Sequence, residues 1–230
     1  MLEHLGEKLV LQFGESEILG LDIIALLMSW IVMAIIIGFA WWLRQGLNQD
    51  VEEEPSGRLV VLESLMNLLE EQFADAFESD RLKVQLFSFI STLFLFITVS
   101  NWISIVPGLS SPTQDFNITL SLALLVLVIS HYFGMRINGT GRYLKTFAEP
   151  YAFMLPMNII SEVAKPLSHS FRLYGNVFGG AVLITVLTAK LIPILLPAIF
   201  QMFYGLFIGA IQAFVFALLA VSYINVAVEQ

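Results

Sequence analysis

Long apolar blocks, separated by short polar stretches, constrain this 230-residue chain more than any other feature. A helix needs about 20 mostly apolar residues to cross the hydrocarbon core of a membrane. Stretches that meet this requirement lie at residues 19–43, 86–106, 119–135, 156–190 and 199–228. Because 57% of the residues are hydrophobic and 13% are charged, the sequence predicts an all-α integral membrane protein with five membrane helices.

The regions outside these blocks predict a simple domain organisation. Residues 1–18 are acidic and lack the basic head and cleavage site of a signal peptide. We therefore expect an N-terminal outer segment, followed by a single membrane domain over residues 19–230. Residues 59–78 place apolar side chains at helical spacing, with acidic side chains on the opposite face. This pattern predicts an amphipathic helix at the membrane interface.

The distribution of basic residues predicts the orientation in the membrane. The second connection, PGLSSPTQDFN at residues 107–117, contains no lysine or arginine. The first and third connections contain Arg44, Arg58, Arg81, Lys83, Arg136, Arg142 and Lys145. Basic residues are retained in short cytoplasmic loops. We therefore expect the N-terminus outside and the C-terminus in the cytoplasm.

Composition excludes several classes of function. The chain has no cysteine, which excludes disulfides, thiolate metal sites and cysteine nucleophiles. It also has no basic patch suited to a nucleic acid and no phosphate-binding loop suited to a nucleotide. We expect no metal, no cofactor and no nucleic-acid partner.

The fourth block differs from the others in length and polarity. As one helix, residues 156–190 would be roughly 50 Å long, against a hydrocarbon core of about 30 Å, so the helix must tilt, break or leave the bilayer. Pro166 predicts a kink, because it lacks the N–H that the Glu162 carbonyl would accept. At 100° per residue one face collects Asn158, Glu162, Lys165, His169, Arg172, Asn176, Gly179 and Gly180.

Arg172 is the most unusual member of this stripe. An arginine inside a membrane costs several kcal/mol and normally faces a protein interior or an aqueous path, where it has a partner. The other blocks hold few carboxylates, so the counter-charge could belong to another subunit. Glu162 and Lys165 fit an interfacial ion pair as well as a transport role, and His169 fits a structural hydrogen bond. For Gly175 we favour close helix packing.

Four segments resemble one protein family in sequence and in order. They are SPTQDFNITLSLAL at 111–124, SHYFG at 130–134, KPLSHSFRLYGNVFGG at 165–180 and GAIQAFVFALLAVSYINVA at 209–227. This set resembles subunit a of F-type ATP synthases, the membrane stator that faces the ring of c subunits. The resemblance covers most of the chain from residue 100 onward.

The resemblance implies a fold and a function. The last two membrane helices would be long, strongly tilted and packed against the c-ring, with two offset half-channels opening to opposite sides. Arg172 would face the c-ring carboxylate. The chain would be a non-catalytic, ion-translocating subunit without a nucleotide site. Its partners would be the c-ring, b-type peripheral stalk subunits and the other synthase subunits, in an energy-transducing membrane such as the bacterial inner membrane.

The resemblance also assigns residues to the ion path. Gln212 and Asn176 would lie near the arginine. Asp115 and Asn117 match the outer path, and Glu162, Ser161 and Asn158 would lie near the inner one. His169 and Lys165 are further candidates for ion translocation. Some relatives carry an ionisable pair where this chain has Ala181 and Gly205. Because neither residue can relay a proton, Na⁺ is an alternative to the favoured H⁺.

Two other functions are possible from the residues alone. An intramembrane hydrolase could use His169 or His131 with a serine, but the sequence lacks a G-x-S-x-G nucleophile motif. A stand-alone secondary transporter is disfavoured because no inverted repeat is evident.

Overall fold

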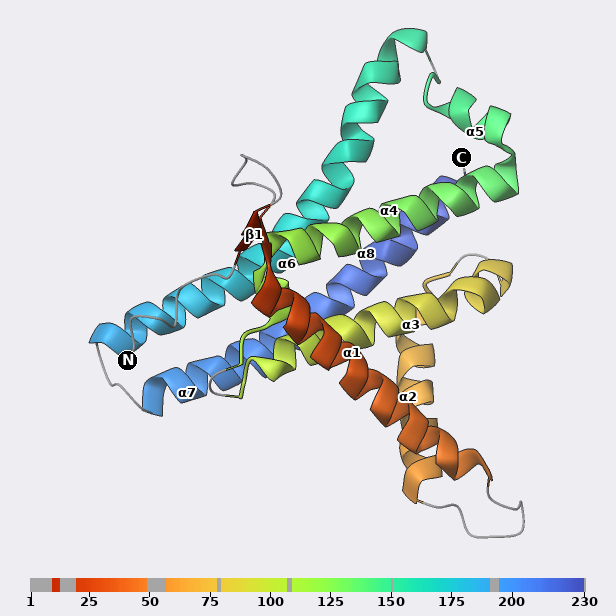
Figure 1. Ribbon diagram of the computed structural model, residues 1–230. Coiled ribbons are helices and arrows are strands. Elements are labelled where there is room, and N and C mark those ends of the chain that lie inside the picture. Colours follow the sequence, from red (N-terminus) through yellow and green to blue (C-terminus); the bar gives the residue numbers. More distant parts are fainter. Residues whose placement is uncertain are drawn as a thin grey trace.

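The computed structural model describes residues 10–12, 20–48, 57–77, 80–106, 109–149, 151–190 and 195–229 (Figure 1). In this part of the chain, the helices long and apolar enough to cross a membrane are Ile23–Leu47, Leu82–Ile103, Phe116–Asn138 and Ile199–Glu229. They confirm the predicted helical membrane protein. The remaining predicted span forms a single helix, α6 (Leu155–Lys190), which carries the charged residues Glu162, Lys165, Arg172 and Lys190 and is not in that set. The total of five spans stays a prediction.

The helices follow one another with short connections. Their bounds are α1 (Ile23–Arg44), η2 (Gln45–Asn48), α2 (Gly57–Phe73), α3 (Asp80–Ile103), η3 (Pro112–Gln114), α4 (Phe116–Asn138), α5 (Thr140–Thr146), η4 (Ala152–Met154), α6, α7 (Leu195–Met202), η5 (Phe203–Ile208) and α8 (Gly209–Glu229). The predicted amphipathic helix is α2, which ends at Phe73 and not at residue 78.

A small pair of strands precedes the first helix. The sequence patterns did not predict this strand pair. Strand β1 (Val10–Gln12) pairs antiparallel with β2 (Gly20–Asp22). Helix α1, predicted to begin at residue 19, begins at Ile23, because the Asp22 carboxylate accepts the backbone N–H of Ile24 at 3.0 Å and caps the helix. The rest of the predicted outer segment, residues 1–9 and 13–18, lies outside the described residues.

Helix α8 lies at the centre of the bundle. It packs against α3 and α4, and α4 packs in turn against α6. Figure 1 shows α8 running between α3 and α4, with α1 crossing in front of α3 and α8. Three small residues of α8 are fully buried: Ala213, Ala217 and Ala220. Small side chains of this kind allow membrane helices to approach one another closely. This contact holds the helices that carry the polar residues in fixed positions.

Helix α6 changes direction along its length (Figure 1). Its first turns diverge from α4, whereas its second half, together with α7, extends beyond the ends of α3 and α4. Pro166 lies inside this helix. It has no backbone N–H to donate to the preceding turn, which was the reason for predicting a kink at this position. The bend separates the two ends of the polar stripe.

The last predicted span is not a regular α-helix throughout. Residues 203–208 between α7 and α8 form a π-helix. Such segments arise mostly as single-turn bulges and are frequent at functional sites.

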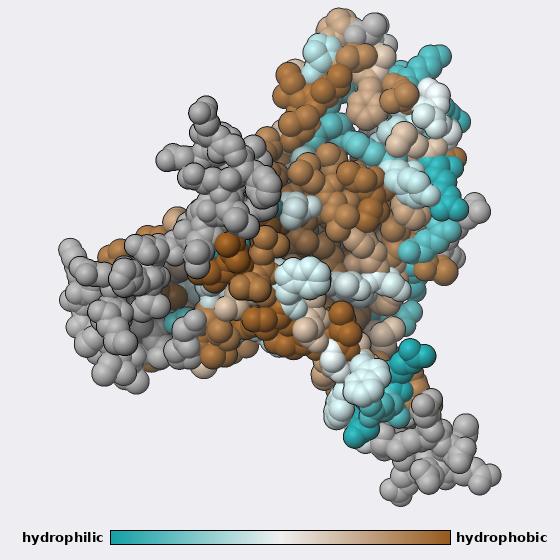
Figure 2. All heavy atoms as spheres, in the orientation of Figure 1, coloured by the Kyte–Doolittle hydropathy of each residue, from teal (hydrophilic) through white to brown (hydrophobic). Residues whose placement is uncertain are grey.

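The outer surface has the character of a membrane protein. Figure 2 shows apolar residues over much of the visible helix surface, with hydrophilic residues gathered toward α5 and the far end of α1. Large side chains such as Trp30, Ile37 and Trp41 of α1 are exposed. Contact with lipid or with other membrane subunits would remove these side chains from water.

Candidate functional site

Arg172 lies on the exposed side of α6, and the adjacent Leu173 is fully buried in the bundle. No carboxylate of the described residues forms an ion pair with this guanidinium. A guanidinium at membrane depth needs a counter-charge. The described residues do not supply that charge to Arg172.

The surface next to Arg172 is open. No atom outside the local helix lies within 4 Å of a Cβ built on Gly175 or Gly179. The packing interpretation of Gly175 is therefore wrong for the described residues. Gly180 is the glycine of this motif that packs closely, because a Cβ there would lie 2.7 Å from Cδ1 of Tyr204.

Asn176 and Gln212 join two helices near the arginine. The Asn176 side-chain amide donates to Oε1 of Gln212 at 2.6 Å, linking α6 to α8. Arg172 and Asn176 are one helical turn apart on α6. The structure therefore brings together residues that are far apart in the sequence and that the resemblance placed near the arginine.

His169 is buried, with 2% of its surface exposed. Its ring centroid lies 3.7 Å from that of Phe216, and its Nε2 has no hydrogen-bond partner. The neighbouring Ser170 hydroxyl lies 3.1 Å from that of Thr119 on α4. His169 thus lies against α8 with one ring nitrogen unpaired, whereas Ser170 joins α6 to α4.

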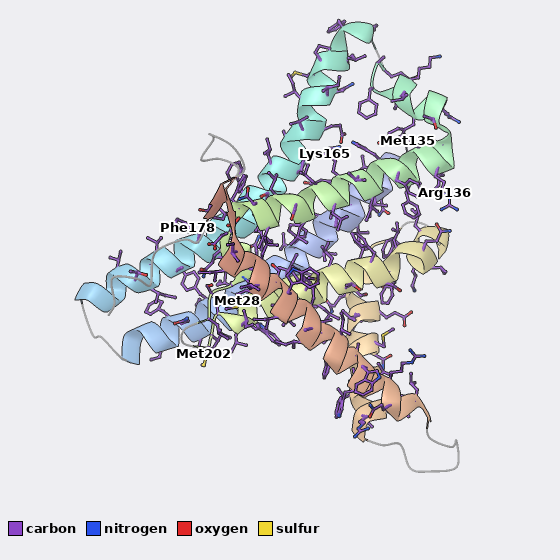
Figure 3. The ribbon with its side chains drawn as sticks, viewed as in Figure 1. Met28, Met135, Arg136, Lys165, Phe178 and Met202 are labelled. Carbon is purple, nitrogen blue, oxygen red and sulfur yellow. The ribbon has the colours of Figure 1, made fainter. Side chains whose placement is uncertain are left out.

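A charged cluster surrounds the first half of α6. Glu162 forms an ion pair with Lys165, and Nε2 of His131 on α4 lies 3.9 Å from the other Glu162 oxygen. Figure 3 shows Lys165 on the part of α6 that diverges from α4. A cavity of about 330 Å³ lies here, lined by Thr146, Phe147, Glu149, Asn158, Ser161, Glu162 and Lys165.

Tyr143 and His131 extend this cluster. Sequence reasoning missed Tyr143 entirely and considered His131 only as a hydrolase residue. Gly139, with a φ of 81°, separates α4 from α5 and allows the chain to bring Tyr143 back against His131. The Tyr143 hydroxyl lies 2.8 Å from Nδ1 of His131. Burial, with a smaller effect of Glu162, raises the pKa of Tyr143 to about 12, so this hydroxyl keeps its proton at neutral pH.

A second cavity, of about 220 Å³, lies between α3, α6 and the π-helix. It is lined by Asn101, Ser104, Gln114, Asn176, Val177, Gly180, Ala181, Ile184, Thr185, Gln201, Tyr204, Gly205, Ile208, Gly209 and Gln212. Ala181 and Gly205 both line it. Gln114, Gln201 and Asn101 were not predicted, because the helix contacts that bring them together are not visible in the sequence.

Asp115 follows the lining residue Gln114, and neither Asp115 nor Asn117 lines this cavity. The Asp115 carboxylate accepts the backbone N–H of Asn117 at 2.7 Å and caps α4. Asp115 therefore has a structural role in addition to any role in ion access.

The fold and these cavities define a multi-pass helical membrane protein with polar spaces inside its bundle. The family model for the ATP synthase A chain matches residues 26–225. ATP synthase subunit a of Desulforamulus reducens is 34% identical over 217 residues, covering 91% of this chain and 81% of the relative. The chloroplastic subunit a of Oedogonium cardiacum is 37% identical over 238 residues, covering 97% and 88%.

A third relative is ATP synthase subunit a 1 of Crocosphaera subtropica, 37% identical over 196 residues, covering 85% of this chain and 83% of the relative. The chain belongs to the ATP synthase subunit a family. It is a non-catalytic ion-channel subunit of the Fo sector, works with other ATP synthase subunits and lies in an energy-transducing membrane. Neither the hydrolase nor the stand-alone transporter fits this family.

Proposed function

We propose that this chain forms the two half-channels of the Fo stator and places Arg172 against the ion-binding carboxylate of a c-ring. One observation carries the proposal. Arg172 is exposed and unpaired within the described residues, and polar cavities lie on both sides of it along α6. Four α6 residues between positions 158 and 165 line one cavity, and six between positions 176 and 185 line the other.

The arginine separates the two paths electrostatically. A guanidinium does not lose its proton in proteins, whereas a buried lysine can. A fixed positive charge favours the ionised form of a nearby rotor carboxylate, so the carboxylate releases its ion before it passes. The same charge repels cations that would move directly from one cavity to the other. Ions therefore cross only by turning the ring.

The remaining residues divide between the two paths. Asp115 and Asn117 flank the outer cavity, and Asn176 with Gln212 joins it to the arginine. The inner path uses the 330 Å³ cavity and its residues Asn158, Ser161, Glu162 and Lys165. His169 lies between Lys165 and Arg172 on α6 and completes the inner path with its unpaired Nε2.

The basic connections set the orientation of this arrangement. The cavity near η3 opens outward, and the cavity near α5 opens to the cytoplasm of a bacterium whose inner membrane holds the complex. Arg142 and Lys145 on α5 support this assignment. b-type stalk subunits hold the chain against rotation.

Replacement of Arg172 tests the proposal. We expect Arg172→Ala to abolish ion-driven ATP synthesis by the complete enzyme in vesicles, with normal membrane insertion and assembly. Arg142→Ala is the matched control, because Arg142 is exposed on α5 outside the spans, and it should keep the wild-type rate. Coupled synthesis at the wild-type rate by well-assembled Arg172→Ala enzyme would disprove the proposed role.

A further inference from the structure

The polar lining of the 220 Å³ cavity is almost entirely neutral. It contains amides and hydroxyls from Asn101, Ser104, Gln114, Asn176, Thr185, Gln201 and Gln212. Tyr204 is its titratable side chain, and no Asp, Glu, His, Lys or Arg of the described residues lines it. The charged residues adjacent to lining residues are Asp115, next to Gln114, and Arg172, one turn before Asn176.

The packing prevents a larger side chain at the π-helix wall. A Cβ on Gly205 would lie 2.6 Å from Cγ1 of Ile105, and a Cβ on Gly209 would lie 2.7 Å from Cβ of Asn101. The Cβ of Asn101 is fixed to the backbone, whereas Cγ1 of Ile105 can move only if that side chain changes rotamer. An ionisable residue at position 205 would therefore require Ile105, just after the end of α3, to move.

Side chains of α3 also fix the backbone of this wall. The Asn101 amide donates to the Gly209 carbonyl at 3.0 Å, and the Trp102 indole N–H donates to the Leu206 carbonyl at 3.4 Å. Oδ1 of Asn101 accepts from the Thr113 hydroxyl at 2.7 Å. The nitrogen and the oxygen of the Asn101 side chain each make one of these bonds, and the residue is buried, so it holds the wall in place.

Gln201 and Thr185 retain hydrogen-bonding capacity in the cavity. The Gln201 amide nitrogen donates to the Ser104 carbonyl, and its Oε1 accepts no bond from the described residues. Thr185 donates to the Ala181 carbonyl at 2.9 Å, which leaves its oxygen free to accept. Gln201 precedes Gly205 by four residues, and Thr185 follows Ala181 by four. Ala181 and Gly205, which carry no polar side chain, thus each have a neutral polar residue one helical turn away.

We propose that Gln201, assisted by Thr185, determines how the driving ion crosses this cavity: the ion moves through water held by neutral side chains, and no protein carboxylate in the cavity takes it up. This inference rests on the proposed half-channel function. A neutral amide both donates to and accepts from water at any physiological pH. The rate at which ions pass through this cavity should then not depend on the protonation of any side chain that lines it.

The test uses the complete ATP synthase in vesicles. We would measure the initial rate of ATP synthesis against the pH of the compartment from which the ion enters, at constant total driving force. Gln201→Met removes the amide at similar length and should lower the rate about tenfold at every pH. Gln201→Glu keeps the shape and adds a titrating carboxylate, so it should introduce a pH-dependent step that the wild type lacks. Thr185→Val should also lower the rate of ATP synthesis, as Gln201→Met does.

Controls separate a role in ion access from a structural role. Met202→Leu changes an exposed neighbour that does not line the cavity and should match the wild type. A wild-type rate for Gln201→Met, or a wild-type pH profile for Gln201→Glu, would overturn the inference. If the Gln201→Met enzyme does not assemble, the inference is tested by Gln201→Glu and Thr185→Val. In the same vesicles, loss of synthesis in Arg172→Ala combined with wild-type behaviour of the Gln201 variants would refute this inference alone.

Discussion

Asp115 has one structural role and one proposed role. Its carboxylate caps α4 through the Asn117 N–H, and its neighbour Gln114 lines the 220 Å³ cavity that we propose as the outer path. A carboxylate beside a narrow opening raises the local concentration of cations. Because asparagine caps helices about as well as aspartate, the charge can be removed while the cap is kept.

Asp115→Asn should therefore slow ATP synthesis when the driving ion is limiting, with little change in assembly. Asp115→Ala loses the cap as well and should cost about 1 kcal/mol of additional stability. Synthesis rates at several concentrations of the driving ion, and the amount of assembled enzyme, would be measured for both variants. Equal rates for Asp115→Asn and wild type at a limiting concentration of the driving ion would show that the Asp115 charge has no role in ion access.

The π-helix is an element that forms one wall of the 220 Å³ cavity. It interrupts the last apolar block, and its carbonyls receive hydrogen bonds from α3 side chains at Leu206 and from Asn101 at the adjoining Gly209. The close approach at Gly209 depends on the missing side chain. Helix α3 and the π-helix therefore form one rigid wall.

Gly209→Ala should destabilise the subunit by about 1–3 kcal/mol, because overpacking forces Asn101 to move. Gly38→Ala is the matched control, since Gly38 lies within α1 with open space around it, and alanine there should be neutral or stabilising. Thermal unfolding of the detergent-solubilised complex would compare the two variants. A Gly209→Ala complex as stable as Gly38→Ala would contradict the close packing.

At the scale of the whole molecule, one face of α6 is uncovered. Arg172, Phe171 and Phe178 are all exposed, and Gly175 and Gly179 have open space around them. A surface that mixes a lone charge with large apolar side chains is expected to be covered by a partner. The c-ring of the proposed complex would supply both the apolar contact and the counter-charge. It would also hold the ion-binding site, so ion identity depends on a part outside this chain.

We expect H⁺ to be the transported ion. ATP synthesis in vesicles should proceed in Na⁺-depleted buffer under a pH gradient and membrane potential, and a protonophore should stop it. A sodium ionophore serves as the control and should have little effect. Strict dependence on added Na⁺, with synthesis that survives the protonophore under a sodium gradient, would reverse the assignment and agree with the absence of ionisable side chains at Ala181 and Gly205.

The sequence predicted the helical membrane class, the positions of the long helices and the unusual arginine. These features depend on local physics: hydropathy over about 20 residues and the cost of a buried charge. Helix ends were predicted less well, because caps such as Asp22 act through single hydrogen bonds. The strand pair and the π-helix had no sequence signal that we recognised.

By itself, the sequence determined that the chain crosses a membrane as helices and carries Arg172 among apolar residues. Only the tertiary structure decided which polar residues meet. Asn176 reaches Gln212, Tyr143 reaches His131, and Gln201 joins Ser104 across helices. Such pairs depend on how helices cross and bend, which periodicity within one segment does not specify.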